Sequence, residues 1–298
     1  MWQSSDPLQA AAVDVADAVF PFDYRGVRPA LARLPADSYA RAAMELLDRR
    51  PGVALLITGF PIKGIAETDG PPGAAAVGRA LRALSWHVVT VVDPMTRPVI
   101  EALARDLGEI EEIDAHGIPQ AEAVTGRLLD RIRPHVAIAI ERPGLTADGR
   151  LANMRGETLD PSPVPMDGLL RVPISMGIGD GGNELGLGSL ASFMRRRRIS
   201  PAPCVTRARH VLLASVSNWG AYGFTAMLEM LAGRPLMPTE TDDRRWMRAI
   251  VRAGAVDGVT ARCEPTVDTF HYDRTASVLH RLADVCETYA QANGRVPA

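Results

Sequence analysis

The chain has 298 residues, of which 47% are hydrophobic and 23% are charged, which is the composition of an ordinary globular protein. Its formal net charge of −2 offers no basic field for nucleic acid, and no apolar run approaches the ~20 residues that a membrane helix needs. The N-terminus lacks a basic secretory signal and the three cysteines form no Cys-x-x-Cys pair, so we expect a cytoplasmic protein with reduced thiols.

The chain begins with about 50 residues in helical spacing, and from residue 53 onward short apolar runs alternate with helical patterns. Strands are expected at 53–60, 87–93, 135–141, 170–177 and 210–215. Helices are expected at 73–86, 97–108, 120–133, 218–233, 241–253 and 273–291, and the longest irregular stretch is 142–169. This alternation predicts an α/β fold, with a mostly parallel sheet and helices on both faces. We expect one α/β catalytic domain over 51–298, preceded by an N-terminal helical extension over 1–50.

Acidic side chains follow three of the expected strands. Glu67 and Asp69 come after the first strand, Glu141 ends the third, and Asp180 and Glu184 follow the fourth. Because ligands bind beyond the carboxyl ends of strands in an open parallel sheet, we expect these carboxylates to meet at one edge. Such a set can hold a metal ion or act as an acid/base pair. Further acidic residues near the last strand end are Asp257, Glu264 and Asp268.

The stretch GIGDGGNELGLG, residues 177–188, fits the G-x-G-x-x-G pattern of a phosphate-binding loop. Asp180 lies in the middle of it, and two like charges 4 Å apart repel by about 1 kcal/mol in water and about 4 kcal/mol at an effective dielectric of 20. A divalent cation reverses the sign of this effect, because Mg²⁺ and Mn²⁺ favour carboxylate and carbonyl oxygens. We therefore interpret the stretch as a metal or polar-ligand loop.

Structural roles compete with the functional ones for each carboxylate. The alternatives are an Asx turn for Asp180, a cap for Glu184 at a helix beginning near Asn183, an N-cap for Asp69 before Pro71, and a surface ion pair of Glu141 with Arg142 or Arg155.

Seven stretches together resemble the D-glutamate cyclase family: TGF (58–60), ETDGPPGAAAVGRAL (67–81), IERPG (140–144), NMRG (153–156), GIGDGGNELGLG (177–188), SNWGAYG (217–223) and DGVT (257–260). The resemblance spans roughly residues 50 to 270. It implies a lyase of D-amino-acid metabolism that interconverts D-glutamate and 5-oxo-D-proline with a divalent metal, Mn²⁺ before Mg²⁺. Together with the charge, the hydropathy and the N-terminus of this chain, it leads us to expect a stand-alone cytoplasmic enzyme with a small-molecule substrate and no nucleic-acid or membrane partner, for which a homo-oligomer stays open.

The candidate site residues follow from the strand ends and this resemblance. The expected catalytic residues are Glu67, Asp69, Asp180 and Glu184, and the expected metal ligands are Asp180, Glu184, Glu67 and Glu141. The expected substrate-binding groups are Asn183, Asn218, Arg155 and the backbone N–H groups of Gly181 and Gly182. Two other functions stay open at this point: a metal-dependent phosphatase or other hydrolase of a small acidic metabolite, and a non-catalytic amino-acid-binding protein.

Overall fold

The computed structural model describes residues 7–294, so the first six residues of the expected N-terminal helical extension and the last four of the expected domain lie outside the described part. Its central sheet has six parallel strands in the order β5-β4-β1-β6-β7-β8. These are β1 (Val53–Thr58), β4 (His87–Val92), β5 (Glu109–Glu112), β6 (Val136–Ile140), β7 (Ile174–Gly179) and β8 (His210–Leu213). The predicted parallel α/β sheet is confirmed.

Ten α-helices accompany the sheet in the described residues. They are α1 (Pro7–Val19), α2 (Ser38–Leu47), α3 (Pro71–Ala83), α4 (Arg97–Glu101), α5 (Ala104–Leu107), α6 (Gly117–Ile132), α7 (Ala191–Arg196), α8 (Ser217–Ala232), α9 (Glu240–Arg252) and α10 (Tyr272–Ala292). Two 3₁₀ helices, η1 (Arg28–Arg33) and η2 (Asp167–Leu170), and a small hairpin of β2 (Pro61–Ile62) and β3 (Ile65–Ala66) complete the fold.

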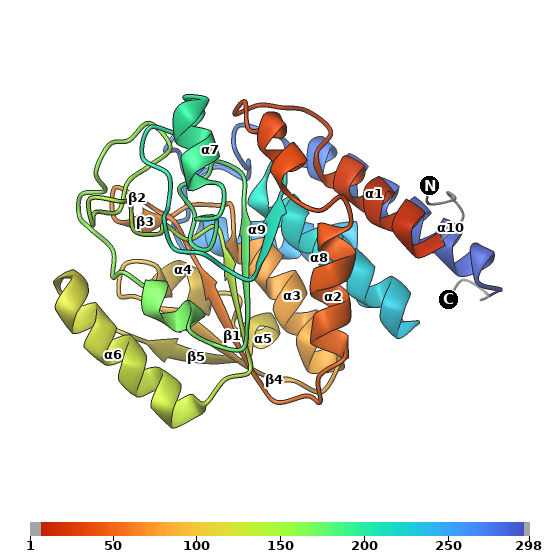
Figure 1. The fold of residues 1–298 in the computed structure, drawn as a ribbon, viewed down its shortest axis with the longest axis horizontal. Helices are drawn as coiled ribbons and strands as arrows, with labels where there is room; N and C mark the ends of the chain where they lie inside the picture. The colour runs from red at the N-terminus through yellow and green to blue at the C-terminus, as the bar shows by residue number, and fades with distance from the viewer. Residues whose placement is uncertain (1–6, 295–298) are drawn as a thin grey trace.

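Helices cover both faces of the sheet because alternate residues of each inner strand are apolar on opposite sides. In β1, Ala54 and Leu56 join the core under α3 and α8, whereas Leu55 and Ile57 join the core under α6. Figure 1 shows α6 on one side of the strands and α2, α3 and α8 on the other. Burial on both faces explains why the strands are continuous apolar runs rather than alternating ones.

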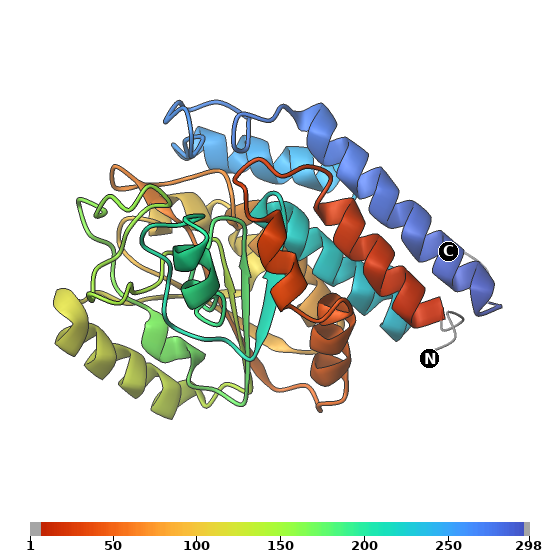
Figure 2. The same cartoon turned by 45° about the horizontal axis from the view of Figure 1, so that its top comes forward.

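The N-terminal segment packs onto the same side as α8. Helix α1 contacts α8 and α10, and α2 contacts α8 and β8. Figure 2 shows α1 and α10 lying side by side as an outer layer. The division of the chain at residue 50 stays a prediction, and this packing brings the segment close to the carboxyl end of the sheet.

Three local expectations differ from the structure. The single helix expected over 97–108 is two short helices, α4 and α5, and the charged edge strand β5 was not expected. No helix begins near Asn183, since α7 starts at Ala191. The irregular stretch expected at 142–169 is confirmed up to η2, which begins at Asp167. None of the helices in residues 7–294 is both long and apolar enough to span a bilayer.

The strand order places a crevice at one point of the sheet. From β1 the chain first adds β4 and β5 on one side and then crosses to add β6, β7 and β8 on the other. The carboxyl ends of β1 and β6 therefore diverge into loops on opposite faces, which is where open α/β sheets bind their ligands.

Candidate functional site

Three carboxylates converge in this crevice, and we call Asp69, Glu141 and Asp180 the acid cluster. Each offers an oxygen, and these oxygens all lie within 4.8 Å of one another. All three residues are buried, with Asp180 fully so at 0% exposure. Within residues 7–294 this is the one group of His, Cys, Asp or Glu side chains close enough to hold a single ion. The expectation that carboxylates from distant strands meet at one edge is thus met by these three.

Asp69 is fixed between two helix starts. Its carboxylate accepts hydrogen bonds from the backbone N–H groups of Gly70, Ser217 and Asn218, at 3.0, 2.9 and 2.8 Å. It therefore lies at the positive N-terminal end of α8 rather than capping α3. Gly70 has φ of 97°, and a Cβ there would come within 2.8 Å of both the Glu141 Cβ and the Thr58 Oγ1. Only glycine allows Asp69 and Glu141 to lie this close.

Glu141 directly follows β6 and has a left-handed conformation, with φ of 44°. Such backbone is strained for a residue with a side chain, and it occurs most often at functional sites. The turn directs the Glu141 carboxylate into the crevice, where it accepts a hydrogen bond from Ser217 Oγ. Arg142, the next residue, donates to Asp93 instead at 2.6 Å. The surface ion pair considered for Glu141 is therefore not formed with Arg142.

Asp180 lacks the hydrogen bonds that a buried carboxylate needs. Neither of its oxygens has a hydrogen-bond partner in the described residues, although Arg25 Nε lies 3.1 Å from Oδ1 as an ion pair. An unsatisfied buried acceptor costs about 1–3 kcal/mol, and more when it is charged. No turn hydrogen bond to the Asp180 side chain is present, so the Asx-turn alternative is not observed.

The electrostatics of the acid cluster favour its protonated forms unless a cation is bound. Burial, together with the charge of Asp268, raises the pKa of Asp69 to about 7 despite its backbone hydrogen bonds. Burial raises the pKa values of Glu141 and Asp180 well above their ordinary range, with further increases from neighbouring carboxylates. Arg25 opposes these shifts. A divalent ion among the three would reverse them, because it stabilises the charged form of each ligand.

Glu67 lies beside the acid cluster but outside it. Its side chain is buried against Gly258, where an added Cβ would lie 1.6 Å from the Glu67 Oε2. Burial raises the pKa of Glu67 well above its ordinary value, and the charges of Asp268 and Asp69 add to the increase. The expected site residue Glu67 thus lies beside the acid cluster, in surroundings that favour its protonated form.

Glu184 organises the glycine loop. Its carboxylate accepts hydrogen bonds from the backbone N–H groups of Gly181 and Gly182, at 2.7 and 2.6 Å. A Cβ on either Gly179 or Gly181 would approach the Glu184 carboxylate to 2.8 Å. The two N–H groups that we expected to bind substrate therefore point at Glu184 in this structure. Glu184 lies outside the acid cluster, and it caps no helix.

The side chains of Asn218 and Asn183, both expected to bind substrate, differ in how many of their polar atoms already form hydrogen bonds. Asn218 Oδ1 accepts from the N–H groups of Gly70 and Gly73, and its Nδ2 donates to the Thr68 carbonyl oxygen. This side chain therefore joins the starts of α3 and α8. Asn183 donates through Nδ2 to Ala152, but its buried Oδ1 has no partner in the described residues. Asn183 thus retains an acceptor for a ligand.

Arg155 is exposed and outside the acid cluster. Its charge is among those that lower the pKa of Tyr24, whose net increase comes from burial and Asp268. Arg155 is therefore close enough to affect Tyr24, but it is not among the buried carboxylates. Its expected role as a substrate clamp stays a prediction.

Sequence reasoning missed Arg25 and Ser217, and gave Asp268 no role. Arg25 donates through Nη2 to Asp268, which has φ of 50° in the loop before α10. Ser217 adjoins Asn218 in SNWGAYG, so its position after β8 was a usable signal. Nothing local marked Arg25, which lies 243 residues from its partner Asp268.

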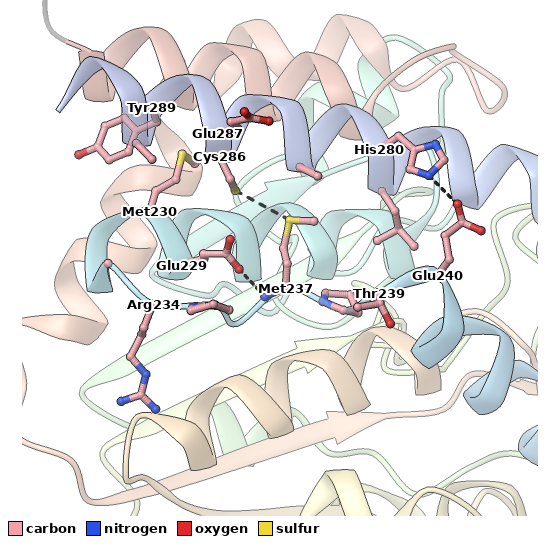
Figure 3. A pocket seen from close by; sticks show the side chains of 16 residues that line it. Glu229, Met230, Arg234, Met237, Thr239, Glu240, His280, Cys286, Glu287 and Tyr289 are labelled. Atoms are coloured by element: carbon pink, nitrogen blue, oxygen red, sulfur yellow. Dashed lines mark hydrogen bonds and ion pairs between the residues drawn. The ribbon is translucent and has the colours of Figure 1, made fainter. Parts of the chain in front are cut away.

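A separate groove of about 540 Å³ lies between the C-terminal part of α8 and α10 (Figure 3). Three of its charged or titratable side chains already have partners: Glu229 accepts from the N–H groups of Leu236 and Met237, and His280 pairs with Glu240. No residue of the acid cluster lines it. We therefore locate the functional site by its chemistry, at the acid cluster.

Comparison with known proteins shows the family of the chain. Residues 19–283 match the sequence profile of the family described as D-glutamate cyclase-like, C-terminal. The chain is also 32% identical over 218 residues to human mitochondrial D-glutamate cyclase. That alignment covers 65% of this chain and 35% of the human protein, so the chain corresponds to about a third of its relative. Because this profile matches most of the chain, the protein belongs to the D-glutamate cyclase-like C-terminal family.

Proposed function

We propose that this protein interconverts D-glutamate and 5-oxo-D-proline plus water with the help of a divalent metal ion. The observation that carries the proposal is the convergence of Asp69, Glu141 and Asp180 at the sheet crevice of a chain from this family. In the forward direction the α-amine attacks the γ-carboxyl carbon, a C–N bond forms, and one oxygen leaves as water. In the reverse direction water adds to the lactam carbonyl and the C–N bond breaks.

The acid cluster fits a hard divalent cation. Its donors are all carboxylate oxygens, which Mn²⁺ and Mg²⁺ favour, and Asp180 has two buried oxygens without a hydrogen-bond partner in the described residues. Asp69, Glu141 and Asp180 would hold the ion. When bound, it would polarise the reacting carboxyl or lactam carbonyl as a Lewis acid. We propose Mn²⁺ rather than Mg²⁺ as the bound ion on the basis of the family resemblance.

Proton transfer requires a titratable group that lies near the metal site but is not itself a metal ligand. Glu67 suits this role because it lies outside the acid cluster, next to it, and because burial keeps its pKa well above the ordinary value. In its protonated form it can protonate the departing oxygen during ring closure, and its carboxylate can take up the amine proton. Ser217 and the backbone of α8 hold Glu141 and Asp69 in place while this occurs.

The experiment that tests this proposal is hydrolysis of 5-oxo-D-proline in ¹⁸O-labelled water by Mn²⁺-loaded protein. We expect D-glutamate carrying one ¹⁸O atom in its γ-carboxyl group, and at least ~100-fold less product from Asp180→Asn. Absence of D-glutamate at full metal occupancy would contradict the cyclase function.

Two parallel assays separate the alternatives. Turnover of phosphate esters without turnover of 5-oxo-D-proline would identify a hydrolase. Tight calorimetric binding of D-glutamate without any conversion would identify an amino-acid-binding protein.

A further inference from the structure

Arg25 comes from the N-terminal segment, yet it lies at the acid cluster. The stretch between α1 and η1 crosses the start of α8, where the Phe22 ring packs 5.6 Å from Trp219 and 4.8 Å from Phe270. Ser215 Oγ also donates to the Phe22 carbonyl oxygen. These contacts fix the backbone three residues before Arg25, so the position of its guanidinium is set by packing.

The guanidinium joins two acidic residues that come from opposite ends of the site. Arg25 Nε lies 3.1 Å from Asp180 Oδ1, Nη2 donates to Asp268, and Nη1 lies 2.9 Å from the Met154 thioether sulfur. The side chain is 13% exposed, whereas Asp180 and Asp268 are 0% and 1% exposed. Arg25 is therefore the partly exposed partner of two buried carboxylates.

The hydrogen-bonding capacity of Arg25 is only partly used. Arginine has five N–H donors, and the structure gives Arg25 one hydrogen bond to a carboxylate and one to a thioether, while its Nε–H has no aligned acceptor in the described residues. A thioether is a weak acceptor, so a carboxylate can replace it with a gain in stability. Arg142, the other buried arginine close to the crevice, already donates through Nη1 and Nη2 to Asp93, Gly59 and Val164, although its Nε–H also has no acceptor in the described residues.

We propose that Arg25 binds the carboxylate on the α-carbon, the one group of the substrate that ring closure leaves unchanged. This inference rests on the proposed function and specifies which residue recognises the substrate. Both D-glutamate and 5-oxo-D-proline carry that carboxylate, and the carboxylates of the acid cluster have the same charge and cannot bind it directly. Arg25 is the one cation of the described residues that forms an ion pair with the acid cluster. The residue predicted from sequence for this role, Arg155, is exposed.

A substrate in which the α-carboxylate is replaced by an amide isolates this contact. The measurement is kcat/KM of Mn²⁺-loaded protein for 5-oxo-D-proline and for 5-oxo-D-prolinamide, in the wild type, Arg25→Gln, Arg25→Lys and two control variants. We expect the wild type to prefer the carboxylate by at least ~100-fold, because charge-assisted bidentate recognition is lost with the amide. In Arg25→Gln the preference should fall below ~10-fold, mainly through a lower kcat/KM for the carboxylate. Arg25→Lys should be intermediate, since it keeps the charge but loses the planar fork.

The controls separate recognition from folding. Arg33→Gln removes an exposed arginine of the same N-terminal segment, which stacks over Phe193 away from the site, and should leave the preference unchanged. Arg155→Gln tests the rival assignment. Urea unfolding of each variant shows whether any loss reflects fewer folded molecules, which would lower both rates equally and leave their ratio intact.

The outcomes can be told apart. A wild-type preference that persists in folded Arg25→Gln would overturn the inference while leaving the proposed function standing. Loss of the preference in Arg155→Gln instead would assign the carboxylate to Arg155. Absence of turnover by the wild type with either compound would overturn the proposed function and this inference together.

Discussion

Two groups of buried charges lie near the carboxyl edge of the sheet, and they differ in whether each charge has a partner. Arg142 is fully buried, but it donates to Asp93 and to two carbonyl oxygens. Burial alone would raise the pKa of Asp93, yet the Arg142 charge and hydrogen bond hold it below its ordinary value. Glu141 directly precedes Arg142 in the chain, but its side chain belongs to the acid cluster. Its pKa is raised well above the ordinary range.

The difference separates charges that stabilise the fold from charges reserved for a ligand. In the Arg142 pair the desolvation of both groups is offset within the protein. In the acid cluster Asp180 has no hydrogen bond from the described residues, so the Arg25 ion pair offsets its desolvation only in part until something else binds. The local strain at Glu141 points the same way, since strained backbone is most common at functional sites.

The largest effect on stability is expected from Arg142→Met. Removing one partner leaves Asp93 buried and uncompensated, which should lower the free energy of unfolding by about 3–5 kcal/mol. Urea unfolding measures this, and the double variant Arg142→Met with Asp93→Asn should recover part of the loss. A loss below ~1 kcal/mol in the single variant would mean that the pair does not stabilise the fold as described.

Asp180→Asn should have the opposite profile. The free energy of unfolding should stay equal or rise, because a buried charge that only Arg25 partly compensates is removed, while kcat/KM should fall at least ~100-fold, or about 2.7 kcal/mol. Asp243→Asn is the matched control: Asp243 is buried, accepts a hydrogen bond from Tyr222, and has a pKa raised to about 6 by burial, but it lies on α9. Equal activity of the two variants would remove Asp180 from the site.

Metal binding should be visible without any assay of turnover. A ligand at 100 times its Kd stabilises the folded state by about 2.7 kcal/mol, so Mn²⁺ added to chelator-stripped protein should raise Tm by several degrees. Asp180→Asn should lose most of this shift, whereas Asp243→Asn should keep it. If stripped wild-type protein, verified by elemental analysis, shows no shift with Mn²⁺ or Mg²⁺, the carboxylates act without a metal.

Glu67→Gln should give the smallest effect, on the pH dependence of stability in metal-free protein. The folded-state pKa of Glu67 is raised above its unfolded value. Glu67 therefore contributes its full stabilisation of the folded wild type below about pH 4, and this contribution is lost as pH rises toward the folded-state pKa. Gln does not titrate. The variant should therefore match the wild type near pH 4 and become progressively more stable than it toward pH 8, as followed by urea unfolding. A constant difference across this range would show that Glu67 is not held in its protonated form.

Much of the fold follows from local pattern, but the site follows only in part. The apolar runs at 53–60 and 135–141 predicted parallel strands, and the rule for strand ends then brought Asp69, Glu141 and Asp180 together. β5 was missed because its sequence, EIEE, is charged, as suits an exposed edge strand. The helix cap considered as an alternative for Glu184 is not observed, because its carboxylate instead accepts from two N–H groups of the turn itself, those of Gly181 and Gly182.

Arg25 could not be predicted for a different reason. Its place depends on aromatic packing of Phe22 against Trp219 and Phe270, residues that are about 200 and 250 positions away in the chain. No periodicity or spacing encodes such a contact. A site assembled at strand ends can be inferred from sequence. The position of a side chain on the packed segment between α1 and η1 can be known only from the tertiary structure.

The central claim is that the acid cluster serves a D-specific interconversion, and chiral chromatography tests it most directly. Mn²⁺-loaded protein is incubated separately with D-glutamate, L-glutamate, 5-oxo-D-proline and 5-oxo-L-proline, and both directions are followed, since intramolecular ring closure has little translational entropy to lose. We predict that the D-series is converted at least ~100-fold faster, about 2.7 kcal/mol in the transition state, because the L-enantiomer cannot meet Arg25 and the acid cluster at once. Equal rates for the two enantiomers, or no conversion of either, would contradict the account.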